Sequence, residues 1–304
     1  MVGKNALRRV AVALTALLLC GLGPPASGSA AAAGHDPNEG YWLVAGDGGV
    51  FAFGGVPFLG SAAGVSHHPV VDIAKTRTGQ GYWLAASDGG VFSFGDARFF
   101  GSLAGRPLVA AGQTVVAMAA ATLFGDGYYL VTSSGGVYTF GAAPFFGAPA
   151  SGPVPYPIVD FGLTPSGHGY WLVDSAGHLY SYGDAPRLSI PEVDPRRARA
   201  VDLRTALEPW NGASVHVMST GGGVFTASTS PETGFFYGAS VDTGRPMADL
   251  ASCRCSGYRQ VDVDGRVHVH GEARHHGSLT DVIPPGRLNR PVAAMLQGGT
   301  GAEL

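Results

Sequence analysis

One phrase is written six times along this chain, and the spacing of its copies constrains the fold more than any other feature. The phrase is clear at residues 40–55, GYWLVAGDGGVFAFGG, and at 81–96, GYWLAASDGGVFSFGD. Successive copies start 41, 46, 42, 44 and 44 residues apart, which is the period of a β-propeller blade. The copies begin at Gly40, Gly81, Gly127, Gly169, Ala213 and Gly257, and the last two diverge most.

The second copy shows how each unit is expected to fold. Glycine is frequent, with 48 of 304 residues, and charged residues are only 13%, which favours short strands joined by tight turns. Residues 82–85 are apolar on both alternating faces, as in a strand covered on two sides. Asp88-Gly89 predicts a two-residue type I′ turn, followed by a strand at 91–94. Short strands at 70–74 and 99–102 bring the predicted total to four strands per unit.

The two ends of the repeat predict how the units are arranged. Pro291–Met295 repeats the inner-strand pattern, but no phrase follows it, and the first phrase at Gly40 has no inner strand before it. We therefore expect an all-β, six-bladed β-propeller whose C-terminal strand completes the first blade and closes the ring, which removes exposed sheet edges. An open β-solenoid is the alternative, but it leaves the spare strand unexplained. The inner strands centre on Asp72, Ala117, Asp160, Asp202, Asp249 and Ala294.

The phrase at residues 81–96 resembles a repeat of secreted actinobacterial proteins, close to GYWLVASDGGVFSFGDAxFYGS. The resemblance is strong over residues 40–190 and weak over 213–278. In that family the repeats often accompany cell-wall hydrolase domains. The resemblance implies secretion, a propeller-like fold and a cell-envelope setting, and it supplies no catalytic residues.

Residues 1–33 read as a secretory signal peptide. Lys4 and Arg8-Arg9 form a basic start, and residues 10–19 form an apolar stretch too short to span a bilayer. Ala31–Ala33 supplies a cleavage site. A twin-arginine signal and lipidation at Cys20 are alternatives, but the flanking residues match both poorly. We expect residues 34–304 to form a single propeller domain.

The charge of the mature chain excludes some partners. The signal segment holds three basic and no acidic residues, so its removal moves the formal net charge from −3 to −6. A mildly acidic chain with no basic stripe argues against nucleic acid. Nothing after residue 34 is long and apolar enough to cross a membrane, and we expect a secreted monomer.

Enzyme motifs are missing from the sequence. It holds no G-x-S-x-G elbow, H-E-x-x-H motif, phosphate-binding loop or complete calcium loop. Residues 262–265, DVDG, resemble the start of a calcium loop, but they occupy the position of the predicted turn in other copies. Turn formation is therefore the better interpretation.

Four of the six inner strands carry an aspartate at the same position. A ring of carboxylates around a central channel suggests a cation site. A structural role is favoured, in which each carboxylate accepts hydrogen bonds from loop backbone groups in its own or a neighbouring blade, because two copies have alanine and unpaired carboxylates would repel one another. These residues are Asp72, Asp160, Asp202 and Asp249.

Residues that depart from the repeat are the candidates for function, since propeller function tends to lie in altered loops. The repeated Tyr-Trp pairs are expected in the core, whereas Trp210 lies in a predicted turn and is a candidate for ligand stacking. The segment 185–199 carries Glu192, Asp194, Arg196, Arg197 and Arg199, and the segment 228–236 lengthens the fifth blade.

Two classes of function follow from these departures. The first is a non-enzymatic module that binds an envelope glycan or a protein partner through blade loops, with Trp210 and the three arginines as contacts. The second is a carbohydrate-active hydrolase or lyase with Glu192 and Asp194 as its carboxylates. Glycosidase carboxylates face each other across a cleft of about 5–10 Å, so two on one loop make binding the preferred class.

The sixth copy replaces aromatic residues by histidine. Alignment of residues 266–278 with 90–102 places His268 and His270 on one strand face, and one of His275 and His276 joins them. Three histidines are the usual number for zinc with an open position, so a transition-metal site at His268, His270 and His275 is a hypothesis. A decayed, polar blade is the alternative. In an exported chain, Cys253 and Cys255 are expected to form a disulfide, with metal ligation as the alternative.

Overall fold

The computed structural model describes residues 39–106, 113–121, 126–149, 154–190, 199–207, 213–229, 244–252, 257–284 and 286–298. The chain divides into two compact units, 1–35 and 36–304, and all described residues belong to the second. The described strands form six antiparallel sheets of three strands each, which we call the first to the sixth blade. The only helix among the described residues is α1 (Leu279–Val282), and no described helix has the length and apolar character needed to cross a membrane.

The bounds of the strands follow the repeat. The first blade is β18 (Val292–Gln297), β1 (Gly40–Ala45) and β2 (Val50–Gly54); the second is β3 (Val70–Lys75), β4 (Gly81–Ala86) and β5 (Val91–Gly95); the third is β6 (Val115–Ala120), β7 (Gly127–Thr132) and β8 (Val137–Gly141); the fourth is β9 (Ile158–Leu163), β10 (Gly169–Asp174) and β11 (Leu179–Gly183); the fifth is β12 (Ala200–Leu207), β13 (Ala213–Ser219) and β14 (Val224–Ser228); the sixth is β15 (Met247–Ser252), β16 (Gly257–Asp262) and β17 (Val267–Gly271).

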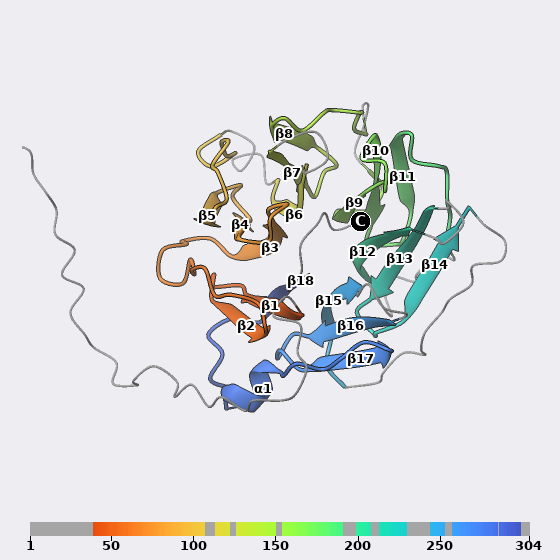
Figure 1. Ribbon diagram of the computed structural model, residues 1–304. Coiled ribbons are helices and arrows are strands. Elements are labelled where there is room, and N and C mark those ends of the chain that lie inside the picture. Colours follow the sequence, from red (N-terminus) through yellow and green to blue (C-terminus); the bar gives the residue numbers. More distant parts are fainter. Residues whose placement is uncertain are drawn as a thin grey trace, which may run out of the picture. The chain divides into compact units, whose positions relative to one another are not determined.

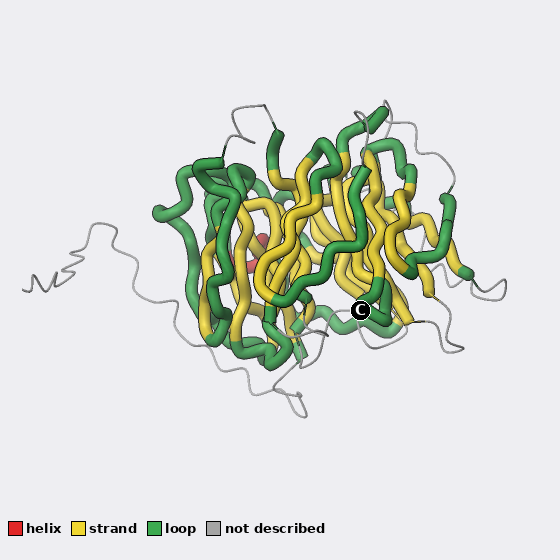
Figure 2. Tube along the Cα trace, turned by 90° about the horizontal axis from the view of Figure 1, so that it is seen from above, coloured by secondary structure: helices red, strands yellow, loops and turns green. Residues whose placement is uncertain are grey.

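The blades follow one another around a common centre. Each inner strand contacts the inner strand of the next blade, from β3 to β6, β9, β12 and β15 in turn. β18 contacts β15 on one side and β3 on the other, and Figure 1 shows these six strands nearest the centre. In the view of Figure 2 the strands occupy the middle of the unit and most connections gather at its two ends. The arrangement is propeller-like.

The C-terminal strand joins the N-terminal repeat as the sequence predicts. β18 pairs antiparallel with β1, with Trp42 opposite Leu296 and Leu43 opposite Met295. The hairpin partner β2 lies on the other side of β1. The first blade is thus assembled from the two ends of the unit.

The core consists of layers between blades rather than one central mass. Every residue of the middle strands β1, β4, β7 and β10 is buried, so the prediction of strands covered on both faces is confirmed. Between the first two blades, for example, the rings of Trp42 and Tyr82 lie 5.7 Å apart and pack around Leu84. Among the described residues, one hydrophobic cluster occupies each of the six boundaries between adjacent blades.

The predicted fourth strand is wrong for the described blades. In every blade but the fifth, the segment after the third strand lies within the described residues and contains no strand. We call these segments straps; they are residues 55–61, 96–102, 142–148, 184–190 and 272–278. Side chains occupy the backbone groups that a fourth strand would use. In the second blade, Trp83 Nε1–H donates to Arg98 O at 2.8 Å. Tyr128 of the third blade accepts from Phe100 N–H at 3.2 Å and donates to Gly101 O.

A tyrosine clasp of this kind recurs between blades. Tyr41, Tyr82 and Tyr170 make the same pair of hydrogen bonds to the strap of the preceding blade. The close approach needs glycine in the strap. At Gly101, where φ is +129°, an added Cβ would lie 2.9 Å from the ring of Phe140.

The turn between the middle and outer strands is longer than predicted. In the second blade, β4 ends at Ala86 and β5 begins at Val91, so more than two residues join them. The connection contains a β-turn closed by Gly89 N–H, which donates to Ala86 O at 2.8 Å. Asp88 Oδ1 accepts from Gly90 N–H at 2.9 Å. Gly89 has φ +82°, a backbone conformation that favours glycine, as the sequence predicts for this position. The connection between the strands is longer than predicted.

Candidate functional site

A β-bulge shapes the inner strand of every blade. In β3 the pairing register jumps from Val70 to Asp72, which leaves Val71 without a partner. A bulge bends a strand and redirects its side chains. The same jump occurs in all six blades, and it fixes one common position for the repeated aspartate. The skipped residues are Val71, Val116, Val159, Val201, Ala248 and Ala293, and all are partly exposed.

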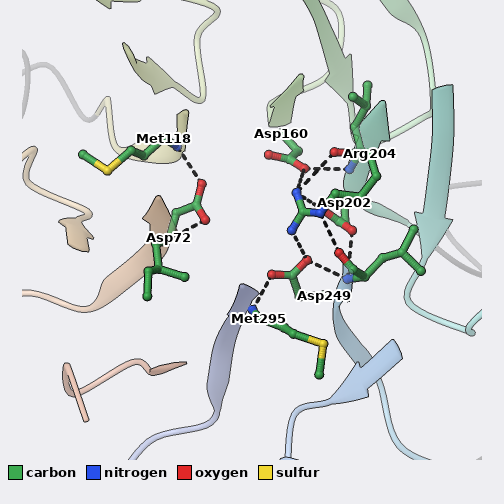
Figure 3. A network of polar contacts seen from close by, with 10 residues as sticks. Asp72, Met118, Asp160, Asp202, Arg204, Asp249 and Met295 are labelled. Carbon is green, nitrogen blue, oxygen red and sulfur yellow. Dashed lines mark hydrogen bonds and ion pairs between the residues drawn. The ribbon is translucent and has the colours of Figure 1, made fainter. Parts of the chain in front are cut away.

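Each repeated aspartate reaches across to the next blade. Asp72 Oδ2 accepts from Met118 N–H of β6 at 2.6 Å, and Asp249 Oδ2 accepts from Met295 N–H of β18 at 2.6 Å, as Figure 3 shows. Asp160 and Asp202 make the same bond to Leu203 and Leu250, at 2.6 and 2.9 Å. Each carboxylate therefore joins two inner strands, and its partner is a strand N–H rather than a loop group.

Arg204 lies among three of these carboxylates, and the sequence analysis did not single it out. Its Nη1 is 3.0 Å from Asp202 Oδ1 and 3.7 Å from Asp160 Oδ2, while Nη2 is 2.6 Å from Asp249 Oδ1. Nε–H donates to Leu250 O at 2.6 Å. We call Asp72, Asp160, Asp202, Arg204 and Asp249 the hub. In Figure 3, Asp72 stands apart from the group around Arg204.

One signal for Arg204 was present in the sequence. At the position two residues after the aspartate, the other five blades carry Ala74, Ala119, Gly162, Ala251 and Leu296. A single charged residue in a series of small or apolar residues predicts a partner of opposite charge nearby. What the sequence could not give is that the partners come from three different blades.

Burial and crowding raise the pKa values of Asp72, Asp202 and Asp249. The pKa of Asp249 rises to about 6, because burial outweighs the guanidinium of Arg204 and the N–H of Met295. The pKa of Asp202 is raised well above its ordinary value by burial, against the effect of Arg204. Removal from water and the neighbouring charge of Asp160 raise the pKa of Asp72 in the same direction.

The sixth blade does not bring its histidines into one cluster. His268 Nε2 lies 3.6 Å from Asp262 Oδ2, whereas His270 stacks on Tyr258 with ring centroids 4.6 Å apart. His275 Nε2 is 3.2 Å from Ser278 Oγ. Within the described ranges, no three His, Cys, Asp or Glu side chains gather to hold a metal ion. The arrangement is that of separate polar contacts.

The fourth blade contains a polar cluster of a different kind. Asp174 is fully buried, and its Oδ2 lies 2.9 Å from His178 Nδ1 and accepts from Tyr180 O–H at 3.0 Å. Its Oδ1 accepts from the N–H groups of Ala176 and His178. The ring of Tyr156 lies beside the imidazole, with centroids 5.7 Å apart. Sequence analysis missed this cluster because it read the segment as an ordinary repeat.

Several residues proposed from the sequence lie outside the described residues. They are Glu192, Asp194, Arg196, Arg197, Trp210, Cys253 and Cys255. Of the predicted contacts in the loop 185–199, Arg199 is described; it is exposed, its N–H donates to Thr220 Oγ1 at 3.1 Å, and its O accepts from Thr220 N–H at 2.8 Å.

Comparisons with known proteins find solved structures but no sequence family. No family model matches the chain, and no curated protein matches its sequence. Solved structures with similar folds include one described as YCF48 bound to D1 peptide, at 13% identity and TM-score 0.46, covering 87% of this chain and 88% of that one. YCF48 from Cyanidioschyzon merolae matches at 11% identity and TM-score 0.41, covering 73% of each chain. A protein of unknown function from Bacteroides caccae matches at 9% identity and TM-score 0.49, covering 86% of this chain and 99% of that chain.

Proposed function

We propose that this chain is a secreted, monomeric binding module of the cell envelope, built as a closed six-bladed propeller. In this proposal residues 1–33 direct export, and the loops at one end of the blades engage a glycan or protein partner. The actinobacterial repeat that the sequence resembles belongs to the same setting.

One observation carries the proposal: the side chains that recur from blade to blade make their hydrogen bonds within the scaffold. The recurring tryptophan or tyrosine binds its own strap, the recurring tyrosine clasps the preceding strap, and the recurring aspartate joins inner strands. His178 and Arg199, which differ between blades, lie in connections and are partly or fully exposed. A rigid frame with individual loops is the usual design of a binding domain.

Fractionation of cells that express the full chain tests export, and retention on cell-wall material tests binding. We expect the protein in the culture medium or wall fraction, starting at Gly34, and we expect it to be retained by purified wall glycan or by an envelope protein. Retention of the uncleaved chain in the cytoplasm would overturn export. Failure to bind either wall glycan or any envelope protein would overturn the binding function.

A further inference from the structure

In the first three blades a single side-chain oxygen caps the turn that joins the middle and outer strands. In the first and second blades, a partly exposed Asp47 or Asp88 caps it by accepting one backbone N–H through Oδ1, at 2.9 Å in both. In the third blade, Thr132 Oγ1 accepts from Gly136 N–H at 3.0 Å. The turn therefore needs neither a buried carboxylate nor a histidine.

The fourth and sixth blades cap the same turn with a buried carboxylate, Asp174 or Asp262, whose Oδ1 accepts two backbone N–H groups. In the fourth blade the carboxylate also bonds through Oδ2 to a histidine of the turn, His178. Asp174 stands where the first and second blades have Ala45 and Ala86. Its side chain is 0% exposed, and its two oxygens make four contacts. Burying a carboxylate is costly unless its bonds are filled. Here one of those bonds fixes His178 Nδ1, so the neutral imidazole carries its proton on Nδ1 and keeps a lone pair on Nε2. The His178 side chain is 45% exposed, which leaves this acceptor accessible.

An apolar platform lies beside the oriented imidazole. Tyr156 is partly exposed, its ring is tilted by 34° to that of His178, and it is flanked by the exposed Pro155 and Pro157. Backbone bonds hold the platform in place, since Ser175 N–H, from the turn that also carries His178, donates to Pro157 O at 2.9 Å. In the sixth blade the residue at the position of Tyr156 is Arg245, and it contacts Asp264, two residues before the position of His178, at 3.0 Å.

From this combination we propose that Tyr156 and His178 form a saccharide-binding site. A pyranose has an apolar C–H face, which suits the Tyr156 ring, and hydroxyl groups at its edge, which donate to His178 Nε2. Asp174 acts as a positioning residue that holds the imidazole and touches no ligand. The site rests on the proposed binding function and names its ligand class and its contacts.

Calorimetric titration of the secreted protein with chitohexaose, and with peptidoglycan fragments released by muramidase, tests the site. The variants are Tyr156→Ala and His178→Gly, which puts at position 178 the residue that the second blade has at Gly90. Arg266→Gly is the matched control, because Arg266 occupies the same turn position in the sixth blade. Circular dichroism checks that each variant is folded, and Tyr156→His, the residue of the second blade, replaces Tyr156→Ala if that variant unfolds.

We expect both site variants to weaken binding of at least one saccharide probe by about tenfold or more, the effect of one lost hydrogen bond or ring contact, and the control to bind as the wild type does. Wild-type saccharide binding that both variants retain would overturn the site and leave the proposed function standing. Capture of an envelope protein without saccharide binding would also overturn the site, and failure of both kinds of binding would overturn the site and the function together.

Discussion

The second and sixth blades have the same three strands, the same turns and the same strap, but they are held together by different chemistry. In the second blade, Trp83 Nε1–H donates to Arg98 O at 2.8 Å. In the sixth, Arg259 stands at the position of Trp83, and its Nε–H donates to Arg274 O at 2.7 Å. The bond to the strap, fifteen residues further along the chain, is the same although the side chain is not.

The difference extends to the layers between blades. Leu84 of the second blade is replaced by Gln260, which donates to Gly222 O of the fifth blade at 2.9 Å and meets His270 Nε2 at 3.0 Å. Arg259 also reaches Gln297 Oε1 of the first blade at 2.6 Å. The comparison teaches that the repeat specifies a pattern of donors and acceptors more strictly than it specifies apolar residues. A polar blade remains possible because the buried side chains of Arg259 and Gln260 have hydrogen-bond partners.

The largest expected effect is the loss of β18, on which both blades depend. Met295 N–H donates to Asp249 of the sixth blade, and Lys75 Nζ of the second donates to Gln297 O at 2.9 Å. Deletion of residues 289–304 should remove most of a free energy of unfolding that is typically about 5–15 kcal/mol. Urea unfolding measures it. Deletion of residues 299–304 alone is the control and should have little effect, and equal stability of the two deletions would contradict the role of β18.

Next in size is the loss of the polar bonds of the sixth blade. Arg259→Met leaves the acceptors Arg274 O and Gln297 Oε1 unfilled, and Arg259 is only 3% exposed. We expect the free energy of unfolding to fall by about 2–4 kcal/mol. Trp83→Phe, which removes one bond, is the matched variant in the second blade. The comparison fails if Arg259→Met costs no more than Trp83→Phe.

The hub should make stability depend on pH in a direction opposite to that of a salt-bridged surface carboxylate. The pKa of Asp249 is raised from 3.8 to about 6, so the folded protein binds the proton more tightly than the unfolded chain. This contribution is present below pH 3.8 and is lost as the pH rises through about 6. It amounts to about 2–3 kcal/mol.

Urea unfolding of the wild type and Asp249→Asn between pH 4 and pH 6.5 measures the contribution. The stability of the wild type relative to the variant should fall as the pH rises. A relative stability that rises over this range would show that the pKa of Asp249 is lowered in the folded state.

The smallest expected effect concerns one tyrosine clasp. Tyr128→Phe removes the bonds to Phe100 N–H and Gly101 O while keeping the ring. The midpoint of urea unfolding should shift by an amount that corresponds to about 1 kcal/mol. Tyr138→Phe, on the outer strand β8, is the control and should change stability less. The fifth blade carries Val215 at the aligned position, so a blade can form without this tyrosine. An unchanged stability of Tyr128→Phe would mean that the clasp adds nothing to the stability of the third blade either.

Much of the fold could be predicted because the repeat records it several times. The alignment of Pro291–Met295 with the inner strands was enough to predict that β18 pairs with β1. The strap was misread because Phe99–Ser102 has the local pattern of a strand. Its backbone groups instead bond to Tyr128, which is 28 residues further along the chain, and local pattern carries no information about that contact.

The candidate sites were harder to predict for the same physical reason. The role of Arg204 depends on the carboxylates of three blades, and the most distant of them in sequence is 45 residues away. The role of His178 depends on Asp174, at the end of β10, and on Tyr156, in the segment that precedes β9. The histidines of the sixth blade were expected together, but they have separate partners: His268 lies beside Asp262, and His270 stacks on Tyr258. The position of a residue in the repeat predicts its place on the backbone. It does not predict which side chains of other blades that residue contacts.

Hydrogen exchange of the backbone amides of β18 tests the closed propeller most directly. In a closed ring the amides of Val292–Gln297 have the same surroundings as those of Val70–Lys75, since both strands pair with a buried middle strand and have inner-strand neighbours on both sides. We predict that the two strands exchange at similarly slow rates in the native protein, read by mass spectrometry of the peptides that cover them. Rapid exchange of Val292–Gln297 while Val70–Lys75 stays protected would contradict closure of the ring.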